Sequence, residues 1–89
     1  MRLVLYTRRG CHLCEEAEDL LAAAGRQPVL VDVDTDAAAR GRFGLRVPVL
    51  EVDGAVALEG RFDAARLARI LSEPEIQAAP GEGVGEGDR

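Results

Sequence analysis

Two cysteines three positions apart are the residues of this chain most suited to chemistry. Cys11 and Cys14 are its only cysteines, and its only histidine, His12, lies between them. One thiolate of such a pair can attack a disulfide, and the other can then resolve the mixed disulfide that forms. Because the loop that they would close is very short, a disulfide between them would add little to stability. The spacing therefore predicts a dithiol redox site.

The residues around the pair predict a turn from a strand into a helix. Residues 2–6 form a short apolar run typical of a buried strand inside a sheet, and apolar residues recur at helical spacing from Leu13 to Ala24. The first N–H groups of a helix are unpaired and carry partial positive charge, which stabilises a thiolate. We therefore expect Cys11 to be the attacking cysteine, with a lowered pKa. Cys14, on the apolar face, is the expected resolving cysteine.

Charged neighbours are expected to tune the reactivity of Cys11. Arg8 and Arg9 precede it and favour its thiolate, whereas the two glutamates that follow the pair oppose it. His12, when protonated, would make the disulfide more oxidising. The alternative for all three basic residues is that they are ordinary solvated side chains on a surface turn.

A metal site is one alternative for the same residues. A Cys-X-X-Cys pair is half of a zinc site, and His12 could supply a third ligand. The chain has no third cysteine and no second histidine, so carboxylates or a second copy of the chain would have to complete the site. We therefore favour redox chemistry and expect no metal site.

The remaining pattern predicts an α/β domain in the order β-α-β-α-β-β-α. Further strands are expected at residues 29–33, 48–52 and 55–59, and helices at about 11–24, 37–43 and 63–71. A helix between the first two strands implies that they are parallel. Gly25 is expected to end the first helix, Asp63 to begin the last one, and Asp53-Gly54 to form a hairpin turn. The result is a four-stranded mixed sheet.

Composition divides the chain into a domain at residues 1–73 and a tail at residues 74–89. The tail is rich in Gly, Pro and Glu, has little to bury, and is expected to be disordered. Residues after Leu71 carry −4 of the net charge of −5, so the domain is nearly neutral. With no basic stripe, no long apolar stretch and no leader, we expect no nucleic-acid or membrane partner. We expect a cytoplasmic protein that acts as a monomer.

The string YTRRGCHLCEEAE and the segment Arg46-Val47-Pro48 resemble the bacterial glutaredoxin-like family of the thioredoxin superfamily. The resemblance covers about residues 2–71. It implies a thioredoxin-like (glutaredoxin-type) fold of three layers, with a cis peptide bond between Val47 and Pro48 beside the dithiol. It also implies a thiol–disulfide oxidoreductase with no resident cofactor. Its partners would be protein or low-molecular-weight disulfides, with glutathione as a candidate co-substrate.

The resemblance further implies a set of residues that would bind glutathione or another substrate. Arg8 matches the basic residue that meets a glutathione carboxylate. Val47 matches the residue whose backbone pairs with an extended substrate. Gly60 and Asp63 match the loop that holds the γ-glutamyl end. The implied binding residues are thus Arg8, Val47, Pro48, Gly60 and Asp63.

The chain departs from the glutaredoxin pattern at several of the neighbouring positions. Arg46 stands where a threonine is usual, Glu59 and Phe62 interrupt the glycine- and aspartate-containing loop, and His12-Leu13 replaces Pro-Tyr between the cysteines. Two other functions use the same kind of cysteine pair. One is a copper- or zinc-carrying domain, and the other is a carrier of a glutathione-ligated iron–sulfur cluster.

Overall fold

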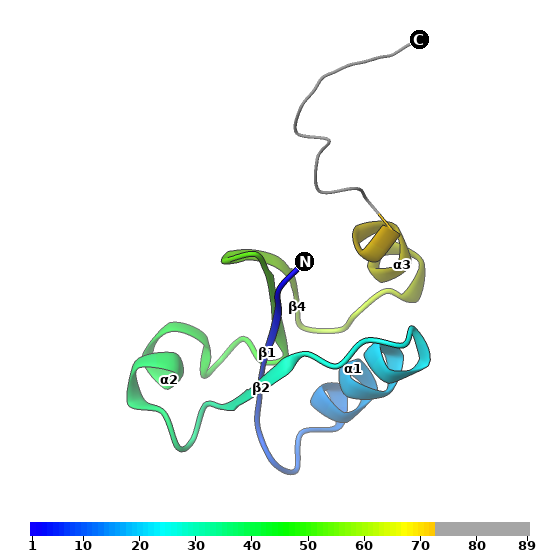
Figure 1. Ribbon diagram of the computed structural model, residues 1–89. Helices are drawn as coiled ribbons and strands as arrows, with labels where there is room; N and C mark the ends of the chain where they lie inside the picture. Colours follow the sequence, from blue (N-terminus) through cyan, green and yellow to red (C-terminus); the bar gives the residue numbers. More distant parts are fainter. Residues whose placement is uncertain (73–89) are drawn as a thin grey trace, which may run out of the picture.

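A four-stranded mixed sheet organises the part of the chain that the computed structural model describes, residues 1–72 (Figure 1). The elements are β1 (Leu3–Thr7), α1 (His12–Ala23), β2 (Val29–Asp32), α2 (Ala37–Phe43), β3 (Val49–Val52), β4 (Ala55–Glu59) and α3 (Ala64–Ser72). In space the strands lie in the order β2-β1-β3-β4, with β1 parallel to β2 and antiparallel to β3. The predicted element order and mixed sheet are confirmed. The tail predicted at 74–89 lies outside the described residues.

Local signals end and connect these elements as expected. The carboxylates of Asp36 and Asp63 each accept a backbone N–H of the helix that follows, at 2.9 Å. Gly25, with φ of 75°, ends the chain's first helical segment in a conformation that side chains disfavour. Asp53 and Gly54 have φ values of 51° and 88° and turn the chain between β3 and β4. None of the helices in residues 1–72 is long and apolar enough to cross a membrane.

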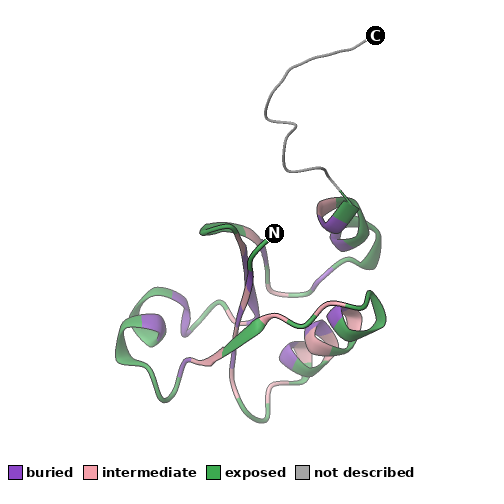
Figure 2. Cartoon of the chain, viewed as in Figure 1, coloured by how far each residue is buried: buried purple, intermediate pink, exposed green. Residues whose placement is uncertain are grey.

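The larger core layer lies between the sheet and the two helices α1 and α3. Apolar side chains of β1, β3 and β4 meet those of both helices there, and the buried faces of the helices turn toward the strands (Figure 2). The buried members of this layer are Leu3, Leu5, Ala17, Leu21, Leu50, Leu58, Phe62, Leu67 and Leu71. This layer holds α1, and with it both cysteines, against the sheet.

The opposite face of the sheet is only partly covered, because α2 has just seven residues. Phe43 of α2 packs on this face, with its ring centroid 4.6 Å from that of Tyr6. Beyond α2 the face opens into a hollow of about 570 Å³, with Val4, Glu51 and Asp53 among its lining residues. The first strand lies inside the sheet as expected, but it is buried on one face only, since Val4 and Tyr6 on the other face are only half-buried.

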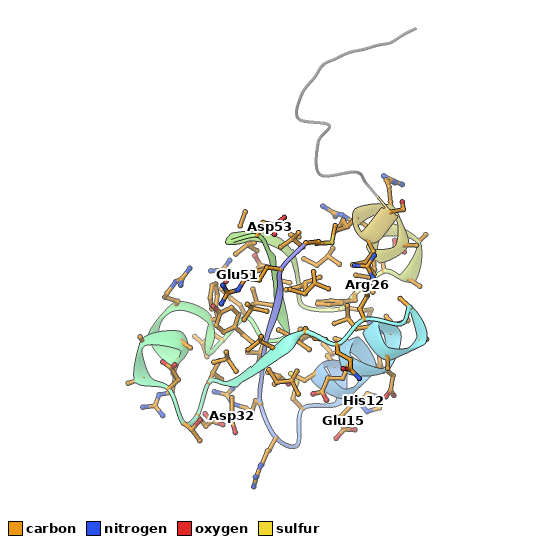
Figure 3. All side chains as sticks on the ribbon, in the orientation of Figure 1. His12, Glu15, Arg26, Asp32, Glu51 and Asp53 are labelled. Carbon is orange, nitrogen blue, oxygen red and sulfur yellow. The ribbon has the colours of Figure 1, made fainter. Side chains whose placement is uncertain are left out.

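Glu51 is a buried carboxylate in the middle of this face. It is 8% exposed, and its Oε1 accepts a hydrogen bond from the Tyr6 hydroxyl at 3.0 Å. Its Oε2 lies 3.5 Å from Nη2 of Arg42. Burial, and then the neighbouring Glu51 carboxylate, raise the pKa of Tyr6. Figure 3 shows Glu51 and Asp53 far from His12 and Glu15, so this cluster is separate from the cysteine pair.

Candidate functional site

The cysteine pair and the proline before β3 lie at the same end of the sheet. Thr7, the last residue of β1, pairs with Asp32 at the end of β2. The antiparallel register between β1 and β3, extended by one residue, places Pro48 beside Thr7. The N–H of Gly60, just after β4, donates to the carbonyl of Pro48 at 2.9 Å. The loop that carries Cys11 thus starts from the same edge as the proline and the loop after β4.

Cys11 caps the N-terminus of α1 with its sulfur. Its backbone is extended, its carbonyl accepts the N–H of Glu15 at 3.0 Å, and its Sγ accepts the N–H of Cys14 at 3.2 Å. The sulfur therefore stands where Ser, Asp or Asn oxygens usually cap a helix. Cys11 is partly exposed, so a substrate can reach this sulfur. The positive end of a helix is a site that favours an anionic sulfur.

Cys14 lies one turn further along α1 and is fully buried, with 0% exposure. Burial raises the pKa of its thiol, and the thiol of Cys11 adds to the rise. Hydrogen bonds from the Thr7 hydroxyl and the Arg8 backbone act in the opposite direction and favour the thiolate. Both cysteines are free in this structure. One accessible and one sealed sulfur is the asymmetry expected of an attacking and a resolving cysteine.

Arg8 joins two loops at this end of the sheet. Its Nε and Nη2 donate to the two carboxylate oxygens of Asp34 at 2.9 and 3.0 Å, and its Nη1 donates to the carbonyl of Gly44 at 2.9 Å. Its positive charge interacts with both cysteine sulfurs. The predicted contact of Arg8 with a glutathione carboxylate stays a prediction, and such a ligand would compete with Asp34. The sequence did not single out Asp34 as a site residue, because its partner Arg8 lies 26 residues away in the chain.

Two residues predicted to tune the reactivity of Cys11 lie on the surface. Arg9 is exposed. The side chain of His12 is 82% exposed, and its Nε2 lies 2.8 Å from Oε2 of Glu16, one turn along α1. Figure 3 shows His12 and Glu15 together at the start of α1. Their influence on Cys11 stays a prediction.

Two of the departures from the glutaredoxin pattern pair with each other. Nε and Nη2 of Arg46 donate to the two carboxylate oxygens of Glu59 at 2.8 and 2.7 Å, which ties the segment before β3 to the end of β4. This ion pair holds the pKa of Glu59 below its usual range. The guanidinium of Arg46 also lies 5.3 Å from the ring centroid of Phe43. Sequence reasoning noted both departures and missed that they compensate each other.

The remaining predicted binding residues have defined surroundings. The peptide bond between Val47 and Pro48 is cis, as the resemblance implies, and Pro48 is fully buried. Gly60 has a positive φ of 74°. Asp63 uses its carboxylate to cap α3. Within residues 1–72, no group of three or more His, Cys, Asp or Glu side chains is arranged to hold a metal ion.

Comparisons with known proteins identify a family and several solved structures that this chain resembles. Residues 2–72 match the family model described as Glutaredoxin-like domain (DUF836). The X-ray structure of target protein XcR50 from X. campestris is 44% identical with a TM-score of 0.69, and the match covers 81% of this chain and 99% of that one. No curated protein matches the chain.

Two more distant solved structures share the fold. The solution structure of protein Ne2328 from Nitrosomonas europaea is 27% identical with a TM-score of 0.68, and the match covers 80% of this chain and 91% of that one. The crystal structure of the thioredoxin-like protein BC3987 is 27% identical with a TM-score of 0.65. That match covers 78% of this chain and 99% of the other. The thioredoxin-like fold predicted from the sequence is thereby confirmed.

Proposed function

Because the chain belongs to the glutaredoxin-like domain family, we propose that it is a thiol–disulfide oxidoreductase in which Cys11 attacks and Cys14 resolves. The observation that carries the proposal is the asymmetry of the pair. Cys11 is accessible at the positive end of α1, whereas Cys14 is buried and donates its N–H to the sulfur of Cys11 at 3.2 Å. A substrate in solvent can therefore react with the sulfur of Cys11, whereas the sulfur of Cys14 can react only with groups inside the protein.

The reaction has two displacement steps. The Cys11 thiolate attacks one sulfur of a substrate disulfide, so a mixed disulfide forms and the first substrate sulfur leaves as a thiolate. The Cys14 thiolate then attacks Sγ of Cys11. The mixed disulfide breaks, an intramolecular disulfide forms, and the second substrate thiolate leaves. The protein's two thiols are oxidised and the substrate disulfide is reduced.

We propose protein disulfides as the principal substrates. Within residues 1–72, the N–H and C=O of Val47 have no hydrogen-bond partner, which leaves them able to pair with an extended segment of a substrate. Leu45, two residues earlier, is fully exposed and offers apolar surface to a protein partner. Arg8 and Arg46 are each engaged by a carboxylate, so glutathione would have to displace an ion pair to use them. Glutathione mixed disulfides are the second substrate class.

Separate replacement of the two cysteines tests the proposed function. Cys11→Ser should reduce exchange to the uncatalysed rate, because it removes the attacking sulfur. Cys14→Ser should still react once and then remain joined to the substrate as a stable mixed disulfide. Mass spectrometry after incubation with a protein disulfide, or with glutathione disulfide, detects the trapped species. Trapping on Cys14 in the Cys11→Ser protein, with no adduct on Cys11 in the other variant, would reverse the assignment.

A further inference from the structure

Cys14 needs a proton acceptor inside the protein before it can resolve a mixed disulfide. Its thiol must become a thiolate to attack, and burial disfavours that charged form. The side chain is 0% exposed, so water cannot take the proton directly. The groups that contact its sulfur therefore decide where the proton goes.

Thr7 and Glu18 lie next to this sulfur because of regular secondary structure. Thr7 ends β1 on the same face as the buried Leu3 and Leu5, which turns its side chain toward α1. Glu18 follows Cys14 by four residues on α1, so the two side chains share one face of the helix. The Thr7 hydroxyl donates to Oε2 of Glu18 at 3.3 Å. The same hydroxyl is close enough to the Cys14 sulfur to favour its thiolate form.

A hydroxyl has one hydrogen and two lone pairs, so it can accept from one neighbour while it donates to another. We propose that Thr7 and Glu18 form a proton path from the buried Cys14 thiol to solvent. The Cys14 proton passes to Oγ1 of Thr7 as the Thr7 hydroxyl proton passes to Oε2 of Glu18. Thr7 then donates to the new thiolate. Thr7 is 8% exposed whereas Glu18 is only half-buried, so the path leads outward.

The path rests on the proposed function and completes its second step. When Cys14 attacks Sγ of Cys11, the electron pair of the broken S–S bond leaves on the substrate sulfur. The proton held by Glu18 then passes to solvent or to that thiolate. Glu18 ends as a carboxylate, and the net products are the protein disulfide and the reduced substrate. No further oxidant or reductant is required.

A symmetrical aromatic disulfide that releases one coloured thiolate at each step separates the two displacements. In stopped-flow absorbance, the first phase reports attack by Cys11 and the second reports resolution by Cys14. Glu18→Gln keeps a hydrogen-bond acceptor for Thr7 but cannot take the proton. We expect it to slow the second phase about tenfold or more and to leave the first within about twofold. Asp19→Asn, an exposed change of the same charge on the same helix, is the matched control and should alter neither phase.

Thr7 supplies the second variant pair. Thr7→Val should slow the second phase to a similar extent because it removes the hydroxyl at nearly constant volume, and Thr7→Ser should restore it. A role that only anchors β1 to α1 would change thermal stability without changing the second phase. If the Thr7→Val protein does not fold, the Glu18→Gln variant alone tests the proton path, because Glu18 is half-exposed and its substitution leaves the core intact.

The sign of the Glu18→Gln effect separates the path from simple electrostatics. A carboxylate that acted only through its charge would oppose the thiolate, so its removal would speed resolution. An unchanged or faster second phase in Glu18→Gln would overturn the proton path, and so would a failure of Thr7→Ser to restore the rate. Absence of both phases in the unmodified protein would instead count against the oxidoreductase function itself.

Discussion

Arg8 illustrates how a single residue sets the shape of the site. Three of its nitrogen atoms donate to Asp34 and to the carbonyl of Gly44, so it holds the loop after β1 against the loop after β2. The loop that Arg8 holds is the one that leads into Cys11. Loss of the ion pair should therefore loosen both loops.

The ion pair predicts a specific pH dependence of stability. Arg8 holds the pKa of Asp34 below its usual range, so the pair stabilises the folded state fully above about pH 3.9. That stabilisation is lost as the pH falls through the lowered pKa. Asp34→Asn should therefore lower the melting temperature at pH 7, and its difference from the unmodified protein should shrink below about pH 4. Asp19→Asn serves as the control. Equal differences at pH 7 and at the acid end of the scan would contradict the pairing.

At the scale of elements, the end of α2 is built around a glycine. The N–H of Gly44 donates to the carbonyl of Arg40 at 2.9 Å, and its own carbonyl accepts from Arg8. A Cβ built at Gly44 would lie 2.6 Å from the Arg40 carbonyl oxygen, whereas one at Gly41 would meet nothing within 4 Å. Because the Arg40 carbonyl oxygen belongs to the backbone, it cannot rotate away from a methyl group at Gly44 as the end of a flexible side chain could.

Two alanine substitutions three residues apart should therefore have opposite effects. Gly44→Ala should lower the free energy of unfolding by about 1–3 kcal/mol, because the backbone must shift to admit the methyl group. Gly41→Ala should raise it by about 0.5–1 kcal/mol, because alanine is the better helix former. Denaturant unfolding of both variants measures this. No loss of stability in Gly44→Ala would contradict the role of the close approach, and a loss in Gly41→Ala would contradict the predicted gain from helix propensity.

At the scale of the whole molecule, a thick core layer on one side of the sheet contrasts with exposed apolar surface near the site. Leu21 of α1 is 0% exposed and packs in the layer beneath α1 and α3. Leu45, between α2 and β3, contacts solvent on all sides with 102% exposure. The same residue type thus has two different roles.

Leu→Ala at these two positions should separate stability from substrate recognition. Leu21→Ala should cost about 2–5 kcal/mol of unfolding free energy through lost burial and a cavity. Leu45→Ala should stay within about 0.5 kcal/mol of the unmodified protein. We expect it to slow exchange with a protein disulfide while leaving the aromatic disulfide unaffected. Equal effects on both substrates would argue against Leu45 as a docking residue.

The sequence by itself determined the element order, the caps and the turns, because these depend on interactions within a few residues. Hydrophobic periodicity distinguishes strand from helix over one short window. Asp63 caps the last helix, and Gly25 adopts its positive φ, through their immediate neighbours. The cysteine pair is also a local feature that the sequence determines, since the N–H of Cys14 donates to the sulfur of Cys11 within the first turn of the helix.

Only the tertiary structure decided which polar side chains meet. Arg8 and Asp34 are 26 residues apart, and Tyr6 and Glu51 are 45 apart, so their pairing depends on strand order and register. Glu51 can be buried inside a strand because the hydroxyl of Tyr6, on the neighbouring strand, donates a hydrogen bond to it. The consequence of the short α2 likewise depends on the tertiary structure, because only the assembled sheet determines which part of its face α2 leaves uncovered. Such contacts arise where elements pack, and no local pattern in a single sequence encodes the partner.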